Sequence, residues 1–531
     1  MPEKLELTLS TLKASRNEAS VHVLLSGLER KVGTVFEGAL RTLLARRSKN
    51  GHLAALRVLH QLQPEQFDLL ETGRGRLTAA LRDALLHDDE QLFENACTFL
   101  SEFNEYDSLP TLLVLCEEVE SPRQPRALAL TKELADRLGK LVYGPRDEQT
   151  RRDPEMLRHG LLEQFEASVG RYRAHQQDGI VEAYVMLAVP TSSELRAILG
   201  APHHACYRPV IQTLTHSECV GVLKLLFGFL ASADAPSAAL KVIGHRDDPL
   251  FTHRLAAFVR EGLRPNAQRN LKRIASFSWL EAAIDEPASL TEQQQVDYVE
   301  LVPHSGAPLE KQFALFRAIL EAGGLASRVA ACKAVAGFES DESNRILAQA
   351  LDDNQPEVQS IAAAHARQRR LPGTLPKLLR MLDSPHAEVR DTVRKSLSEF
   401  NFQSFAARFE SMNEDLVEST AKLVRKVDPN ITTSLVTELQ SSLRSARLRA
   451  ISMAVLLSSA DEVAEAMIEL LQDPEHVVRV AAADGLQHYD TPSVRGALRL
   501  ALRDKSRSVQ ATAESSLAAL GEPAEPLGDL L

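Results

Sequence analysis

The chain is poor in aromatic residues, which make up 5% of its 531 residues and include one tryptophan, Trp279. Hydrophobic residues nevertheless reach 44%, so the interior must be built mainly from Leu, Ala, Val and Ile. That composition suits closely packed helices and argues against a large sheet. Because the chain is longer than one hydrophobic core usually organises, it comprises either several domains or a repeat array.

Cysteine, leader-like segments and long apolar runs are also scarce. Five cysteines are too few, and odd in number, for the disulfide framework of a small secreted protein. The opening residues Met-Pro-Glu-Lys-Leu-Glu-Leu lack a basic segment followed by an apolar core, so we expect no signal peptide. The longest apolar stretch, 220–231, is interrupted by Lys224 and falls short of the ~20 residues of a membrane span. We therefore expect a cytoplasmic protein with no membrane span.

Positive charge is in deficit, with 61 Lys and Arg against 72 Asp and Glu and a formal net charge of −11. Nonspecific nucleic-acid affinity comes from neutralising phosphates with Lys and Arg, so this balance opposes a general phosphate-binding surface. No long Lys/Arg run is present, although a local basic stripe remains compatible with the composition.

A phrase recurs in the last third of the chain: an apolar helix end, an acidic turn, Val-Arg or Val-Gln, and an Ala-rich run. The phrase is centred on four valines separated by 31, 89 and 31 residues: Val358, Val389, Val478 and Val509. Since the interval of 89 residues is close to three units of about thirty, we expect two degenerate units inside it, beginning at Leu416 and Leu448. With an earlier unit at Ser327, seven helical pairs reach from about residue 313 to the chain end.

The apolar residues after each phrase follow one face of an α-helix. In one unit they are Val478, Ala481, Ala482 and Leu486, at i, i+3, i+4 and i+8. Asp473 precedes this helix, and we expect its carboxylate to cap the free N–H groups. The two degenerate units are expected to bury the following residues in the same way: Leu416, Thr420 and Val424, then Leu448, Ile451, Ser452 and Leu456.

This phrase resembles the HEAT-repeat family, in particular the short bacterial form also seen in phycobilisome-lyase-type repeats. There, Asp precedes a Val-Arg pair that opens the second helix. The resemblance covers residues 313–520 and implies an all-α fold, an α-solenoid of stacked antiparallel helix pairs with second helices lining a concave side. The sequence departs from the pattern where Gln359 and Gln510 replace the arginine kept at Arg390 and Arg479.

Three regions follow from these patterns. Residues 1–312 are expected to form a divergent helical-repeat region, because their helical faces keep a less regular period. Residues 313–520 hold the regular repeats, and residues 521–531 form a C-terminal tail with two prolines. A charged connection at 144–154 interrupts the first region, and long connections of this kind often carry function.

One cluster has metal-ligating residue types. His203 and Cys206 form one His-x-x-Cys pair, and His216 and Cys219 form another 13 residues later. Tetrahedral zinc accepts two nitrogens and two sulfurs, so zinc binding at these four residues is one interpretation. The other is that the thiols are small buried apolar groups, as cysteines in helical arrays commonly are.

Other catalytic patterns are missing. The segment Gly73-Arg74-Gly75 lacks the Gly-Lys-Ser/Thr ending of a phosphate-binding loop. None of the 16 histidines is followed by glutamate, so the His-Glu iron ligands of HEAT-repeat hydroxylases do not carry over. No acid or oxyanion hole accompanies the Cys/His cluster. We predict no catalytic residue, and no cofactor apart from the zinc considered above.

Arginines and acids of the second helices are candidates for partner binding. Arg390 and Arg479 are interpreted as structural, each bonded to an acidic turn such as Asp383 or Asp473. The polar positions that correspond to the concave surface of the family have mixed signs, which suits a folded protein or an extended peptide. These partner-binding candidates are Asp391, Arg394, Lys395, Arg449, Asp484 and Glu514.

The sequence therefore predicts a non-enzymatic scaffold or adaptor that binds partner proteins through an extended solenoid surface. The resemblance to lyase-type repeats leaves a second hypothesis, a lyase-like or chaperone-like accessory subunit acting on a modified or chromophore-bearing protein. A third is a nucleic-acid-binding HEAT-like protein, which the negative net charge disfavours.

Overall fold

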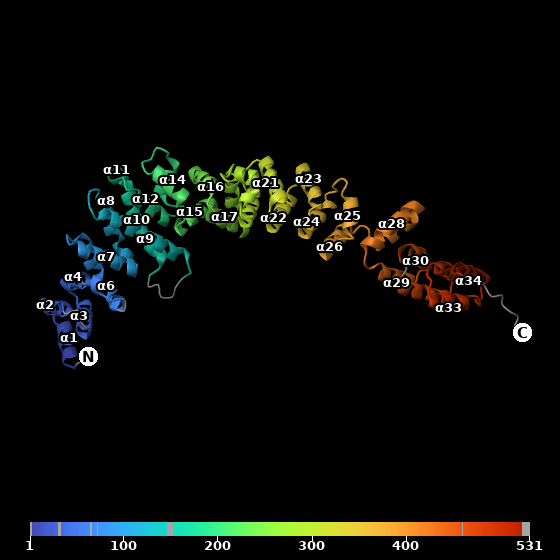
Figure 1. Cartoon of the computed structure of the whole chain (residues 1–531), viewed down its shortest axis with the longest axis horizontal. Helices are drawn as coiled ribbons and strands as arrows, with labels where there is room; N and C mark the ends of the chain where they lie inside the picture. The colour runs from blue at the N-terminus through green and yellow to red at the C-terminus, as the bar shows by residue number, and fades with distance from the viewer. Residues whose placement is uncertain are drawn as a thin grey trace. The chain divides into compact units, whose positions relative to one another are not determined.

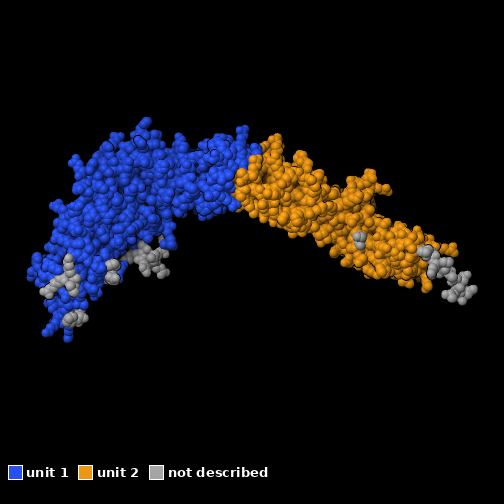
Figure 2. Space-filling view, viewed as in Figure 1, with its two compact units in different colours: residues 1–318 blue, residues 319–531 orange. Residues whose placement is uncertain are grey.

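The protein is described by a computed structural model that covers residues 3–29, 33–63, 66–71, 73–145, 152–458 and 460–522. All regular structure in these residues is helical, so the predicted all-α solenoid is confirmed (Figure 1). The chain divides into two compact units, Met1–Ala318 and Ile319–Leu531 (Figure 2). Most of the predicted tail, 523–531, and the centre of the charged connection, 146–151, lie outside the described residues.

Unit 1 is a succession of antiparallel α-helices of unequal length, which explains why its period is hard to find in the sequence. Its described helices are α1 (Glu3–Ala14), α2 (Ala19–Glu29), α3 (Gly33–Ala45), α4 (Lys49–Arg57), α5 (Phe67–Glu71), α6 (Arg74–Leu86), α7 (Glu90–Phe103), α8 (Leu109–Glu117), α9 (Gln124–Tyr143), α10 (Pro154–Gly170), α11 (Tyr172–His175), α12 (Asp178–Leu187), α13 (Ser193–Gly200), α14 (Tyr207–His216), α15 (Val220–Ala231), α16 (Ser237–His245), α17 (Pro249–Arg260), α18 (Pro265–Leu271), α19 (Leu280–Asp285) and α20 (Glu292–Leu301).

Aspartate carboxylates start several of these helices. Asp89 accepts the N–H groups of Gln91 and Leu92 at the start of α7, and Asp248 accepts that of Phe251 at the start of α17. These bonds satisfy donors that have no partner inside the helix. The acidic turns seen in the sequence of unit 1 are therefore helix starts.

Helices α9, α12 and α15 pack on one another at the centre of unit 1. Gly221 of α15 lies so close to α12 that a Cβ atom there would collide with the carbonyl oxygen of Met186. Only glycine permits this approach of one helix to the end of another.

Unit 2 is regular. Of the seven helical pairs expected from about residue 313 onward, its described residues contain six; α21 (Leu309–Ala322) crosses the boundary between the units, and α22 (Leu325–Ala336) precedes the first of the six. The pairs are α23 (Asp341–Ala350) with α24 (Pro356–Ala366), α25 (Leu375–Met381) with α26 (Ala387–Ser396), α27 (Phe402–Arg408) with α28 (Glu414–Val427), α29 (Ile431–Leu439) with α30 (Arg444–Leu457), α31 (Asp461–Glu469) with α32 (His476–Gly485), and α33 (Pro492–Ala501) with α34 (Arg507–Ala519).

The predicted core faces are correct in the clear repeats and wrong in part in the two degenerate ones. Val478, Ala482 and Leu486 are fully buried, as expected. In α28, however, Leu416 is 51% exposed and the core side chains are Ala421, Val424 and Val427. Leu416 is large and apolar, yet it lies in the first turn, one position away from the buried face.

Helix α30 shows the same kind of error. Of the predicted residues Ile451 is buried, Leu448 and Leu456 are half-buried and Ser452 is exposed. The other buried positions include Ala446, Ala450 and Ala454. Ala446 and Arg447 occupy the positions where other repeats have Val-Arg. Because alanine replaces the valine, the repeated phrase is difficult to recognise in this part of the sequence.

The acidic turns of unit 2 do not cap helices in the predicted way. Asp473 lies three residues before α32 and accepts the N–H of Glu475, at 2.9 Å. Asp353 and Asp504 accept the N–H two residues on in the same manner. Each carboxylate thus shapes the turn and keeps oxygen atoms available for another donor.

The carboxylate oxygens of these turn aspartates bind an arginine of the preceding repeat. Arg479 donates to both carboxylate oxygens of Asp504, at 2.9 and 3.0 Å, and to the carbonyl oxygen of Asp473 in its own turn. Arg447 binds Asp473 in the same way, and Arg328 binds Asp353. The structural interpretation of Arg479 is confirmed, and each link joins two successive repeats.

Where glutamine replaces this arginine, the hydrogen bond to the turn of the same repeat remains. The side-chain amide groups of Gln359 and Gln510 donate to the carbonyl oxygens of Asp353 and Asp504 in their own turns. Arg390 likewise donates to the carbonyl oxygens of its own turn, those of Ser384 and Pro385, and not to Asp383. Links between repeats are therefore discontinuous around α25–α28.

The apolar core of unit 2 is discontinuous at the same place. One cluster of buried side chains runs from Phe402 to Leu517 and includes none of the buried residues of α22–α26. Among the described helices, α22, α24 and α26 pack in one row and α28, α30, α32 and α34 in another, while α26 and α28 have only slight contact. We call the segment 397–401 between these two cores the seam.

Within the described residues, no single helix is long and apolar enough to cross a membrane. Helices α14 and α15 reach that length only when taken together, and they are bent by 102° relative to each other.

Candidate functional site

The four residues of the predicted zinc site lie at the two ends of one helix. His203 lies in the turn before α14 and Cys206 directly precedes that helix, whereas His216 is its last residue and Cys219 directly precedes α15. Because ten helical residues span about 15 Å, the two pairs do not meet at one ion. In the part of the chain that the structure describes, no group of three or more His, Cys, Asp or Glu side chains is placed to hold a metal.

The thiols of the chain are mostly buried among apolar side chains. Cys97, Cys116, Cys206 and Cys332 are fully buried, and Cys219 is half-buried. Burial raises the pKa of Cys206 to about 11 and that of Cys97 to about 12. Since the thiolate is the nucleophile, these thiols are poor candidates for catalysis.

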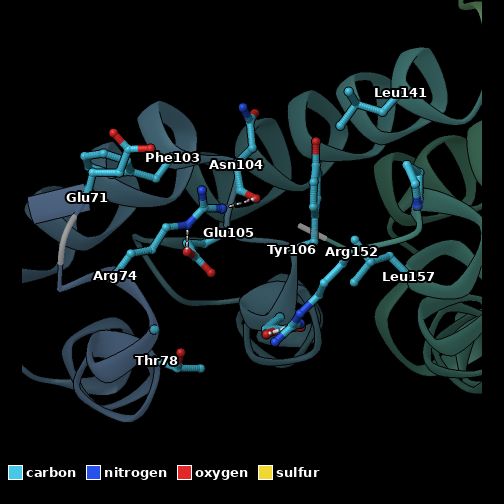
Figure 3. A pocket seen from close by; sticks show the side chains of 13 residues that line it. Glu71, Arg74, Thr78, Phe103, Asn104, Glu105, Tyr106, Leu141, Arg152 and Leu157 are labelled. Carbon is cyan, nitrogen blue, oxygen red and sulfur yellow. Dashed lines mark hydrogen bonds and ion pairs between the residues drawn. The ribbon is translucent and has the colours of Figure 1, made fainter. Parts of the chain in front are cut away.

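A pocket of about 360 Å³ in unit 1 lies between α6, α9, α10 and the 3₁₀ turn Tyr106–Ser108 (Figure 3). Its two guanidinium groups are already bound to carboxylates of the same pocket. Arg74 pairs with Glu105 and also donates to the carbonyl oxygen of Asn104, and Arg152 lies 2.7 Å from Asp107. The pocket therefore offers no unbound arginine to a ligand.

Tyr106 forms one wall of this pocket. The residue is 6% exposed, and its hydroxyl oxygen has no hydrogen-bond partner among the described residues. Burial raises the pKa of Tyr106 to about 12, so the side chain stays a neutral phenol near neutral pH. Neither the sequence nor this geometry gives the pocket a reactive group.

A larger groove in unit 2 has a different electrostatic character. Its volume is about 910 Å³, and it lies where α24, α26 and α27 end and α25 begins. Four basic side chains line it, against the single carboxylate of Glu399. We call it the basic groove, and its basic residues are Arg367, Arg370, Lys395 and Arg408.

Within the described part of the chain, one of these four cations is neutralised by a carboxylate. Arg367 pairs with Glu399 and its guanidinium also lies over the ring of Phe400, 6.0 Å from the ring centroid. Among the described residues, no carboxylate forms an ion pair with Arg370, Lys395 or Arg408, and all three are exposed. Positions at helix ends partly explain them, because cations stabilise helix C-termini. Their convergence on one groove goes beyond that local role.

Arg370 occupies an unusual backbone conformation. Its φ is +52°, in the left-handed region, and the chain continues through Pro372 and Gly373 into α25. Glycine is the usual residue at such a helix end, since a Cβ atom costs roughly 1 kcal/mol there. A long cationic side chain is therefore kept at a position where the backbone favours glycine.

The groove belongs to a local excess of positive charge that the whole-chain count conceals. Residues 365–408 contain nine Lys and Arg against four Asp and Glu, a net charge of +5 in a chain of −11. Lys395 was among the predicted partner-binding residues, but Arg367, Arg370 and Arg408 were missed, because they lie at helix ends rather than on the repeated face. A windowed charge count would have found them.

The other predicted partner-binding residues do not join the groove. Arg394 pairs with Asp391 on α26, at 3.2 Å, and Arg449 of α30 pairs with Glu438 of α29, at 2.8 Å. Asp484 on α32 accepts a hydrogen bond from Gln487, and Glu514 on α34 is exposed. These residues are spread over several repeats, so only Lys395 belongs to a concentrated site.

Comparison with known proteins identifies a family for the C-terminal part of the chain. Residues 315–398 and 432–531 match the family model for HEAT repeats, and no curated protein matches the chain. Among solved structures, a crystal structure of an engineered protein from the Northeast Structural Genomics Consortium aligns with 78% of this chain and 100% of its own length. Its sequence identity is 14% and its TM-score 0.24.

The unmatched stretch 399–431 contains the pair α27 and α28, which follows the seam. The family pattern therefore fails where the links between repeats and the apolar core are interrupted. The segments 315–398 and 432–531 are thus the parts of the chain that match HEAT repeats.

Proposed function

We propose that the protein is a non-enzymatic scaffold that holds partner proteins on the surface of its helical repeats. HEAT repeats commonly serve as protein-interaction scaffolds, because stacked pairs hold many side chains in register along an extended surface. The observation that carries the proposal is the basic groove, whose three unpaired cations have no carboxylate partner among the described residues. We place this scaffold in a reducing cytoplasm, where five free cysteines are expected.

The groove is also the one observation that favours the nucleic-acid hypothesis. A nucleic-acid-binding surface typically makes about six to ten phosphate contacts, whereas three cations are unpaired here. The lyase-like hypothesis needs a reactive group, and the buried thiols with raised pKa values do not supply one. Protein binding therefore agrees best with the charges and the fold.

Affinity capture from a lysate followed by cross-linking mass spectrometry tests the scaffold. We expect the full chain to retain specific proteins after nuclease treatment, with cross-links at Lys377 and Lys395, which lie near or in the basic groove. Lys241, an exposed lysine of unit 1, provides the comparison. Retention of nucleic acid alone, or cross-links confined to unit 1, would contradict the proposal.

A further inference from the structure

We propose that the basic groove binds an acidic segment of a partner protein, and that this segment bridges the seam between the two cores of unit 2. The inference rests on the proposed scaffold function and deepens it, because it names the chemistry of the partner and the place where the partner acts.

The first step concerns unsatisfied charge. Arg370, Lys395 and Arg408 face one groove without an ion pair to a described carboxylate. Arginine presents a planar fork of donors that matches a carboxylate with two parallel hydrogen bonds. A segment with several Asp or Glu side chains would supply these acceptors, and the groove volume of about 910 Å³ is large enough for several side chains.

The second step distinguishes protein from nucleic acid. Residues 365–408 carry a net charge of +5, so the remainder of the chain carries −16. A nucleic acid that extends beyond the groove would approach residues with this net negative charge, whereas a short acidic segment ends within the basic region.

The third step concerns the seam. Lys395 lies at the end of α26, on the side of the first core, and Arg408 ends α27, whose Phe402 and Phe405 belong to the second core. Within the chain, the seam is crossed by exposed links such as the Lys426–Asp383 ion pair, at 2.8 Å. A ligand that binds Lys395 and Arg408 together therefore adds a connection where the contact between α26 and α28 is slight.

Binding of labelled deca-glutamate to the full chain, with deca-glutamine as the neutral probe, tests the groove. We expect Lys395→Glu combined with Arg408→Glu to weaken deca-glutamate binding by about tenfold or more, because attraction becomes repulsion. Lys333→Glu is the matched control, since Lys333 is an exposed lysine of α22 outside the groove. The control is expected to bind like the wild type.

Arg370→Gly separates binding from folding. It removes one cation and also relieves the left-handed backbone of a non-glycine residue, so the melting temperature should stay level or rise. We expect the affinity for deca-glutamate to fall about threefold to tenfold in the same variant. A variant that binds as well as the wild type would exclude Arg370 from the site.

Three results would overturn the proposal. The first is unchanged deca-glutamate binding by the Lys395/Arg408 variant, and the second is an equal loss in the Lys333→Glu control. The third is tighter binding of a 20-base-pair DNA duplex than of deca-glutamate, with a steep salt dependence, which would assign the groove to nucleic acid. Capture of a partner protein by the doubly substituted chain would leave the scaffold function intact while excluding this groove.

Hydrogen exchange provides the readout for the seam. We expect deca-glutamate to slow amide exchange in residues 397–412 of the wild type and to leave that segment unchanged in the doubly substituted chain. Binding without slower exchange in this segment would refute the bridging of the two cores.

Discussion

At the scale of the residue, the arginine and aspartate of the repeated phrase act between repeats. Arg479 and Asp504 are each 14% exposed at their side chains, and their two hydrogen bonds join α32 to the turn before α34. A paired, charge-assisted contact of this kind contributes more than an exposed ion pair. The arginine and aspartate of the phrase therefore connect stacked repeats, and they are poor candidates for a binding site.

Arg479→Ala should lower the free energy of unfolding of the C-terminal repeats by about 1–3 kcal/mol, because Asp504 loses two charged hydrogen bonds. Arg345→Ala is the control: its side chain is 75% exposed and pairs within one helix with Glu342. We expect that control to change stability by about 0.5 kcal/mol or less. Denaturant unfolding followed by circular dichroism measures both, and equal effects would contradict the role of Arg479.

The same pair predicts a dependence on pH. Hydrogen bonds from Arg479 lower the pKa of Asp504, so its carboxylate stabilises the folded state above the ordinary aspartate pKa of about 4. This contribution is lost as the pH falls through the lowered pKa. The stability difference between the wild type and Asp504→Asn should therefore be largest near neutral pH and shrink below about pH 4. A difference that stays constant from pH 7 to pH 3 would exclude this cause.

At the scale of the element, close approaches between helices depend on small residues that a repeat pattern does not reveal. In unit 1, Gly221 allows the start of α15 to meet the end of α12, and Gly139 of α9 lies against the same site. In unit 2, small residues such as Ala446 and Ala450 take the buried positions of α30. Apolar size alone therefore misplaces the face of a helix, as happened at Leu416 and Leu448.

Gly221→Ala should destabilise unit 1 by about 1–3 kcal/mol, since the added Cβ collides with the rigid carbonyl group of Met186 and the helices must move apart. Gly160→Ala in α10 is the matched control, because open space surrounds that position. There we expect a gain of about 0.5–1 kcal/mol from the better helix propensity. Thermal unfolding of the two variants distinguishes them, and a neutral Gly221→Ala would argue against the tight crossing.

At the scale of the whole molecule, each repeat relies on its neighbours, and in unit 2 this dependence is interrupted at the seam. The cluster Phe402 to Leu517 is one core, and α22–α26 form another. Cooperative unfolding spreads through continuous apolar contacts, so the two cores should be able to lose structure separately.

Leu486→Asp tests this separation, because it places a carboxylate at a fully buried position of the second core. Such a charge costs several kcal/mol, and we expect amide protection to be lost first in residues 402–522 and retained in 319–397. Leu500→Asp is the control, since Leu500 is 70% exposed. Simultaneous loss over the whole of unit 2 would show that the seam does not separate the cores.

Periodicity in the sequence was sufficient to predict the helices of unit 2, their pairing and the structural role of Arg479. These features depend on contacts between positions a fixed distance apart in the chain, so they leave a regular pattern. The same pattern predicted buried faces correctly in the repeats where the phrase is clear, as at Val478 and Leu486.

The tertiary structure alone decided what meets in space. It separated His203 and Cys206 from His216 and Cys219 by the length of α14, and it brought Arg370, Lys395 and Arg408 to one groove from three helix ends. Neither outcome follows from spacing along the chain, because both depend on how successive helices turn and stack. The local sequence thus dictates each helix and its capping turn, while the stacking of the pairs determines which of their charges are left to bind another molecule.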